Sequence, residues 1–217
     1  MTTLGDTSGG PSRREREQAQ HRREARQAAE RLLAKKSFRD ITVQEIAREA
    51  EFSVGYLYKL YPGKEDIFAE VIRRRHRQLV ELIEAQAGEG GDPLDALARV
   101  VRAIFAWMGE NLAYTSSSLR DLHLFAQSRP ELVDELRRSD RAMHERITRL
   151  AARAIDHRQL AAQSPELIAR TLRALTWGFI KEGLMDEEYR SDHGAVAEHV
   201  LQVLRRAFAP GGDSPDC

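Results

Sequence analysis

Hydrophobic residues along this chain recur mostly at three- or four-residue spacing, which predicts helices. The pattern places helices at about 12–36, 43–50, 53–61, 64–87, 93–112, 116–127, 130–156, 165–184 and 194–208. No segment shows a convincing alternation of apolar and polar residues, which is typical of strands, and no internal repeat is visible. We therefore expect an all-α protein.

Capping residues and prolines define several of these boundaries. Ser12 with Glu15, and Thr42 with Glu45, have the spacing of capping boxes, in which two side chains satisfy free N–H groups at a helix start. Ser53 is a plausible N-cap for a further short helix. Prolines mark the start of three later helices, at Pro93, Pro130 and Pro165.

A glycine-rich stretch at 88–93, GEGGDP, is the clearest break in the chain. It lacks the Lys-Ser/Thr pair and the preceding strand of a phosphate-binding loop, so we interpret it as a connection between helices. The expected organisation is a disordered tail at 1–11, a compact helical domain at 12–62 and a connecting helix at 63–87. A larger helical domain follows at 93–208, and a flexible tail at 209–217.

Composition narrows the class of protein. Of the 217 residues 41% are hydrophobic, which is enough for a real core. No apolar run approaches the roughly 20 residues that span a bilayer, and the polar, arginine-rich N-terminus is unlike a secretory signal. Cys217 is the only cysteine and lies in the C-terminal tail, which fits a reducing compartment. We expect a cytoplasmic protein that does not bind membranes.

Charge is unevenly distributed along the chain although the net charge is zero. Residues 1–80 contain 17 Lys and Arg against 12 Asp and Glu, whereas residues 81–217 contain 17 against 22. A basic front and an acidic back suit a nucleic-acid-binding domain joined to a domain of another kind.

The segment 41–72, ITVQEIAREAEFSVGYLYKLYPGKEDIFAEVI, holds two short helices separated by a tight turn and followed by a longer helix. This is the pattern of a helix-turn-helix, whose second helix enters the major groove of DNA. Small residues at the tip of that helix allow close approach, hydroxyl and N–H groups bind phosphates, and tyrosines contact sugars or thymine methyls.

These residues resemble the DNA-binding domain of TetR-type transcriptional regulators, whose pattern is T-V-x-x-I-A-x-x-A-G-V-S-x-G-x-L-Y-x-x-F-x-x-K-E-x-L. The matching positions are Thr42, Val43, Ile46, Ala47, Ala50, Ser53, Gly55, Leu57, Tyr58, Lys64 and Glu65, with Tyr61 in the aromatic position. The motif covers about 45 residues. The resemblance implies a homodimeric DNA-binding regulator, usually a repressor that a small ligand releases from its double-stranded operator.

The combined interpretation assigns DNA contacts to nine residues: Thr42, Gln44, Ser53, Val54, Gly55, Tyr56, Tyr58, Lys59 and Lys64. The resemblance implies that Tyr58 and Lys64 touch the backbone, while Gln44, Val54, Gly55 and Tyr56 reach bases. Thr42 both caps a helix and contacts phosphate in this interpretation. Tyr61 and Leu57 are expected in the core.

Three positions depart from the family pattern. Glu51 stands where glycine is usual, which costs about 1 kcal/mol if the position requires a positive φ. Leu60 stands where a histidine often contacts phosphate, so we expect that contact to be absent. Phe52 replaces a smaller apolar residue.

An arginine-rich run precedes the motif, comprising Arg13, Arg14, Arg16, Arg22, Arg23 and Arg26. It has two interpretations. One is an arm that follows phosphates or enters the minor groove. The other is a solvated helix face on which the arginines pair with Glu15, Glu17 and Glu24.

The second domain is expected to dimerise and to bind a ligand. Helices near 165–184 and 194–208 are apolar on more than one side, and the resemblance implies that they pair with their copies in a four-helix bundle. Candidate lining residues for an effector pocket are Phe105, Trp107, Met108, Tyr114, Leu122, Phe125, Met143 and Trp177. These side chains suggest a hydrophobic ligand such as a lipid, an acyl thioester or a drug. His123 and His144 are either polar groups of that pocket or ordinary histidines.

Motifs for catalysis, metal binding or a cofactor are absent from the sequence, which contains no H-E-x-x-H, no G-x-S-x-G and no pair of His or Cys at metal spacing. We expect no catalytic residues, no metal site and no cofactor. A helical adaptor that binds protein, or less plausibly a helical enzyme, remains the alternative, and salt-dependent DNA binding distinguishes both from a regulator.

Overall fold

A computed structural model describes residues 10, 12–88, 90–112, 114–115, 128–185 and 192–210. Throughout these residues the chain is helical or forms turns and connections, without a strand, which confirms the all-α prediction. Contacts divide the chain into two units, Met1–Ile72 and Arg73–Cys217. Most of the predicted tails at 1–11 and 209–217 lies outside the described residues, as do the predicted helix at 116–127 and Leu122, His123 and Phe125.

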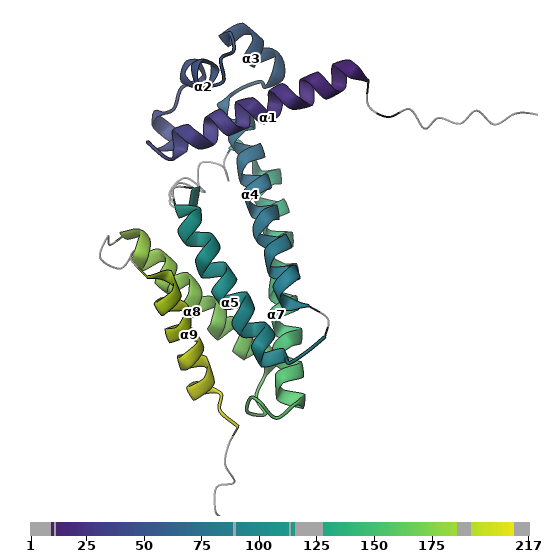
Figure 1. Cartoon of the computed structure of the whole chain (residues 1–217), viewed down its shortest axis with the longest axis vertical. Coiled ribbons are helices and arrows are strands. Elements are labelled where there is room, and N and C mark those ends of the chain that lie inside the picture. The colour runs from purple at the N-terminus through teal and green to yellow at the C-terminus, as the bar shows by residue number, and fades with distance from the viewer. Residues whose placement is uncertain are drawn as a thin grey trace, which may run out of the picture. The chain divides into compact units, whose positions relative to one another are not determined.

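The first unit contains α1 (Arg13–Leu33), a short 3-10 helix η1 (Phe38–Asp40), α2 (Val43–Glu49), α3 (Val54–Leu60) and the start of α4 (Lys64–Ala87) (Figure 1). Both capping boxes are present, at Ser12 and Thr42. The apolar residues in the second half of α1 are buried: Ala25, Ala28, Ala29, Leu32 and Leu33. Phe38 and Phe68 meet edge to face at 4.7 Å between ring centroids, so η1 packs directly against α4.

A Schellman motif ends α2 and sets the direction in which the chain enters α3. The amide of Phe52 donates to the Ala47 carbonyl at 2.8 Å, and the amide of Glu51 donates to the Arg48 carbonyl at 3.2 Å. This pattern requires a left-handed residue after the helix end, which is usually glycine. Here it is Glu51, with a φ of 59°. The positive φ that the family pattern suggested is therefore present, and a side chain occupies it.

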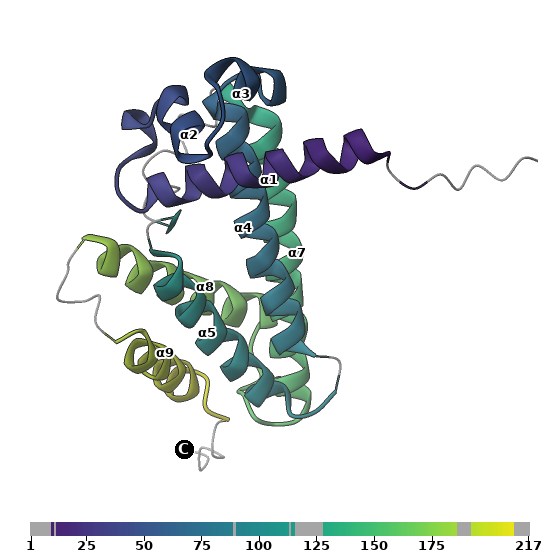
Figure 2. The same cartoon turned by 45° about the horizontal axis from the view of Figure 1, so that its top comes forward.

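The second unit contains the rest of α4 together with α5 (Pro93–Glu110), α7 (Pro130–Asp156), α8 (Pro165–Met185) and α9 (His193–Ala207). The three prolines begin their helices as predicted. Helix α5 packs against α7, α8 and α9, and Figures 1 and 2 place α7 and α9 on opposite sides of it.

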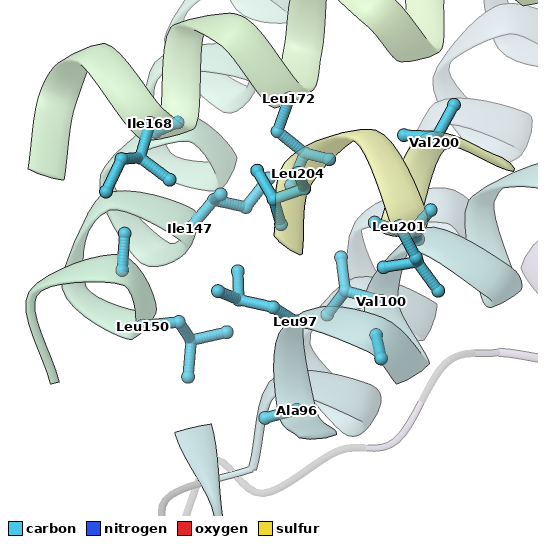
Figure 3. Packing of buried hydrophobic residues seen from close by; sticks show 14 of the residues in the cluster. Ala96, Leu97, Val100, Ile147, Leu150, Ile168, Leu172, Val200, Leu201 and Leu204 are labelled. Atoms are coloured by element: carbon cyan, nitrogen blue, oxygen red, sulfur yellow. The ribbon is translucent and has the colours of Figure 1, made fainter. Parts of the chain in front are cut away.

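Aliphatic side chains of α5, α7, α8 and α9 form most of the core of the second unit (Figure 3), and α4 adds Ile83 and Ala87. Leu97 and Val100 of α5 lie among residues of the three neighbouring helices, which include Ile147, Leu150, Ile168, Leu172, Val200, Leu201 and Leu204. An ion pair and a second polar contact also join α4 to α7 within this unit. Arg73 Nε lies 2.8 Å from Glu135 Oε2, and His76 Nε2 lies 3.6 Å from Asp140 Oδ1.

The left-handed residue at Glu51 leads to a prediction about stability. Replacing Glu51 with Gly should stabilise the protein by about 0.5–1 kcal/mol, because relief of the αL penalty exceeds the extra entropy of glycine in the unfolded chain. Urea denaturation followed by circular dichroism measures the free energy of unfolding. Glu51→Ala is the matched control, since it removes the carboxylate but keeps Cβ. Equal stability of the two variants would show that the backbone is not strained at this position.

Candidate nucleic-acid interface and ligand cavity

Helix α3 has one buried face and one exposed face. Leu57 and Leu60 are buried, as Tyr61 is just after the helix end. On the other face Gly55 and Lys59 are exposed, and the Tyr58 side chain is 51% exposed. An aromatic ring left half in water on a seven-residue helix is available to a partner molecule. The burial of Leu57 and Tyr61 agrees with the expectation that they belong to the core.

Side-chain N-caps stabilise the first turns of α2 and α3, which are the parts of these helices that would meet a phosphate. Ser53 Oγ accepts from the Tyr56 amide at 3.1 Å, and Ser53 itself is exposed. Thr42 Oγ1 accepts from the Glu45 amide at 3.2 Å and donates to Glu45 Oε2 at 2.9 Å. A hydrogen bond from Lys36, followed by those from Thr42, lowers the pKa of Glu45 to about 2. Gln44, next to Thr42, is exposed.

Gly55 lies in the first turn of α3 and has no packing reason in this unit. A Cβ built on Gly55 meets no described heavy atom within 4 Å, and the residue is exposed. Glycine costs roughly 0.5–1 kcal/mol relative to alanine in the middle of a helix, and this is an upper bound for the first turn. The protein therefore carries an open, side-chain-free surface on α3 at an expense to its stability, which is expected where another molecule approaches the backbone closely.

Lys64 has internal partners that its sequence position did not reveal. Its Nζ donates to the carbonyls of Phe38 at 3.1 Å, Arg39 at 3.2 Å and Ile41 at 2.8 Å. It also lies 4.6 Å from the centroid of the Phe38 ring. A lysine ammonium has three N–H donors, and these three carbonyls can take all of them. A phosphate contact by Lys64 would require it to exchange one of these bonds.

Two arginines of the N-terminal run, Arg22 and Arg26, bind partners within the first unit. Arg22 donates to Glu70 Oε1 at 2.8 Å and to the Leu60 carbonyl at 2.6 Å, and it covers the Tyr61 ring. Arg26 pairs with Glu30 at 3.8 Å. Tyr61 also donates to Glu70 at 2.6 Å, and burial together with this carboxylate raises the pKa of Tyr61. Arg22 therefore ties α1 to the end of α3 and to α4.

The remaining arginines of the run lie on the exposed part of α1. Arg13 pairs with Glu17 at 2.9 Å, and Arg23 donates to Gln20 at 3.0 Å. Arg14 and Arg16 are exposed. Part of the run therefore corresponds to a solvated helix face, and an arm role for its exposed residues stays a prediction.

A small cavity in the second unit lies between α5, α8 and α9. Its walls are Phe105, Met108, Leu112, Thr115, Phe179, Ile180, Gly183, His193 and Val196. Its volume is about 20 Å³, which holds one or two water molecules. A larger molecule would enter only if these walls moved apart.

The predicted pocket residues are found in several places. Phe105 and Met108 line the cavity. Trp107 and Tyr114 meet edge to face at 5.9 Å, and Met143 packs against the core. Trp177 is 46% exposed on α8. His144 lies 3.0 Å from Glu166 and so links α7 to α8.

His193 is a cavity residue that the sequence did not indicate. It is the first residue of α9, and its ring lies against the backbone of α5 at Gly109. A Cβ on Gly109 would lie 2.0 Å from His193 Cδ2. Only a glycine leaves room for this approach. No sequence signal connects the two residues, because they are brought together by the packing of α9 on α5.

The described residues contain no cluster of three His, Cys, Asp or Glu side chains that could hold a metal ion. No helix among them is long and apolar enough to span a membrane.

Part of the chain matches a known protein family. Residues 26–71 match the family model described as bacterial regulatory proteins, tetR family. The sequences of curated proteins give no match.

Solved structures resemble nearly the whole chain. The TetR family regulator PfmR of Thermus thermophilus has a TM-score of 0.71 at 20% identity, covering 84% of this chain and 97% of its own. A tetR family regulatory protein of Rhodococcus RHA1 has a TM-score of 0.73 at 21% identity, covering 88% and 98%. FadR of Bacillus subtilis, solved in complex with stearoyl-CoA, has a TM-score of 0.69 at 20% identity, covering 86% and 98%. At these identities the likeness concerns the fold.

The exposed α3, its capped approach from α2 and the separate helical unit define a helix-turn-helix DNA-binding regulator. The family-model match lies on this same segment and extends from α1 into α4. Residues 26–71 therefore match the DNA-binding domain of the tetR family of bacterial regulatory proteins, the family that the sequence motif resembles.

The open surface at Gly55 predicts opposite effects on stability and on DNA binding. Gly55→Ala should stabilise the protein by up to about 0.5 kcal/mol, because Gly55 lies in the first turn of α3. The same change should weaken binding to DNA that the wild-type protein selects from a randomised duplex library, because the methyl group enters the approach surface. Urea denaturation and fluorescence anisotropy measure the two effects.

Gly55→Leu provides a graded second variant. Leucine favours helix almost as well as alanine, so the fold should persist while DNA binding falls further. Undiminished DNA affinity in both variants would remove Gly55 from the interface.

Proposed function

We propose that the protein is a homodimeric repressor that a small, hydrophobic ligand releases from its operator. The observation that carries the DNA-binding part is the exposed face of α3, where an unpacked glycine stands beside an exposed tyrosine and an exposed lysine. The proposed contacts are those derived from the sequence: Thr42, Gln44, Ser53, Val54, Gly55, Tyr56, Tyr58, Lys59 and Lys64.

These residues divide by the contact that each is able to make. Ser53, Tyr58 and Lys59 are exposed and carry groups that bind phosphate, so they would position α3 on the duplex. Gln44 is exposed near the start of α2 and has an amide that can pair with a base edge. Lys64 contributes chiefly by holding η1 to α4, and it reaches phosphate only by exchanging a carbonyl.

Dimerisation through α8 and α9 is supported by apolar residues left in water. Leu167 is 51% and Trp177 46% exposed on α8. Ala174 and Gly178 are exposed at positions that share a helix face with them. A helix-turn-helix dimer places its two recognition helices in major grooves about 34–36 Å apart, so pairing in the second unit would also serve DNA recognition.

The proposed ligand is hydrophobic and carries a polar head. Phe105, Met108 and Ile180 offer apolar walls to it, and Thr115 and His193 offer polar groups. The Bacillus subtilis structure contains stearoyl-CoA, and another similar structure is that of a Clostridium perfringens putative fatty acid metabolism regulator. A long-chain acyl thioester is therefore the first ligand to test. Its size means that binding must separate α5, α8 and α9.

Release would operate through α4. This helix begins in the first unit at Lys64 and continues without interruption to Ala87 in the second. A displacement of its second half changes the spacing of the two recognition helices. Thermodynamic linkage then requires ligand and DNA to weaken each other's binding by the same factor.

Salt-dependent DNA binding tests the DNA-binding part of this proposal. The wild-type protein should bind its selected duplex more tightly than scrambled DNA, and its affinity should fall linearly with salt on logarithmic axes. Lys59→Ala should reduce that slope by about two, since each protomer of a dimer loses one phosphate contact worth roughly 0.9. Anisotropy titrations at several salt concentrations measure the slope, and sedimentation gives the oligomeric state. An unchanged slope would exclude Lys59 from the phosphate contacts.

Stearoyl-CoA added to the same complexes tests release. It should lower DNA affinity by roughly five- to 150-fold, the usual range of coupling between sites. DNA should lower the affinity for stearoyl-CoA by the same factor. Free CoA is the control, because it has the head group without the chain. Tight stearoyl-CoA binding with unaltered DNA affinity would contradict the release mechanism for this ligand.

A further inference from the structure

Three aromatic side chains from different segments meet at the N-terminal end of the recognition helix, α3. They are His21 of α1, Phe52 of the turn and Tyr56 of α3. Each pair of rings is 5.4 Å apart between centroids, with interplanar angles of 74°, 80° and 82°. All three contacts are edge to face, an arrangement that aromatic pairs prefer and that fixes their relative orientation. All three residues are half-buried.

A single polar contact links two members of this cluster. His21 Nδ1 lies 2.6 Å from the Tyr56 hydroxyl. The hydroxyl has one proton to donate and lone pairs to accept with. Its bond to the imidazole uses either the proton or one lone pair, and the remaining capacity of the hydroxyl is left for another partner.

The fold has other means of holding α1 to the recognition helix. Arg22, the next residue along α1, bonds the Leu60 carbonyl at the end of α3 and also pairs with Glu70. Ala25, Ala28 and Ala29 are fully buried on the same helix. These contacts hold α1 to α3 without His21. The hydrogen bond of His21 instead involves the side-chain hydroxyl of Tyr56, the residue next to Gly55.

We propose that His21 is a positioning residue that sets the base preference of α3 by holding Tyr56 in one orientation. This proposal rests on the proposed DNA-binding function, in which Tyr56 reaches bases. A tyrosine with both its ring and its hydroxyl fixed presents one shape and one hydrogen-bonding pattern to the major groove. Without the His21 bond the phenol samples more orientations and accommodates several bases equally.

Base preference, rather than affinity alone, tests this role. The wild type, His21→Phe and Tyr56→Phe would each select DNA from a randomised duplex library, followed by anisotropy on the preferred and substituted sites. Both variants should lower the ratio of preferred to substituted site affinity at one position of each half-site by roughly five- to tenfold, about the effect of one hydrogen bond. Affinity for scrambled DNA should remain within about twofold, because phosphate contacts are not altered.

Two further variants separate positioning from packing. His21→Phe/Tyr56→Phe should be no less selective than either single variant, because both remove the same bond. His21→Asn, which keeps a polar atom near the Nδ1 position, should restore part of the preference. Gln20→Ala is the matched control on α1, since Gln20 bonds Glu24 and Arg23 on its own helix, and it should select the wild-type site.

Several outcomes would overturn the proposal. A His21→Phe protein that selects the wild-type site, with only its thermal stability lowered, would show that His21 belongs to the scaffold. Additive losses in the double variant would show that His21 does not act through the Tyr56 hydroxyl. A wild-type protein that enriches no sequence at all would overturn the proposed function as well, so the two failures are distinguishable.

Discussion

The geometry of the DNA-facing surface depends on one backbone conformation, the left-handed residue at Glu51. With φ at 59°, the chain reverses at the end of α2 and places Phe52 where its amide bonds Ala47. Phe52 then packs against His21 and Tyr56, so the turn that aims α3 also supplies one wall for its first helical residues. A glutamate at this position accepts strain that a glycine would not, and the two Schellman hydrogen bonds offset it.

Contacts within the first unit then hold α3 in this orientation. Arg22 bonds the carbonyl at the end of α3 and the carboxylate of Glu70, while Tyr61 donates to that same carboxylate. Lys64 gathers the carbonyls around η1. Because these charged groups are used internally, the outer face of α3 is left to small and hydroxylated residues with Lys59 as its cation. Residues of one short segment therefore differ in role: Lys64 stabilises the fold, whereas Lys59 is exposed on the outer face of α3.

Local signals were sufficient to predict most of the fold. Capping boxes and prolines gave the helix starts because they act within one helical turn, and the 41–72 motif gave the helix-turn-helix because its spacing is itself local. The partners of Lys64 were not predictable, since they depend on the path of η1. The cavity was predicted only in part: Phe105 and Met108 line it, but Trp177 faces water and His193 was missed. Helices that are apolar on several sides do not reveal which side meets a cavity.

Helix α4 makes a coupling between the units physically reasonable. The boundary between the units falls within it, after Ile72, so they share one continuous hydrogen-bonded helix rather than a flexible linker. Beyond the boundary α4 is tied to α7 by Arg73 with Glu135 and by His76 with Asp140. Burial lowers the pKa of His76, whereas the Asp140 side chain is exposed. In the proposed release mechanism, rearrangement of the helices packed on α7 would reach α4 through these two contacts.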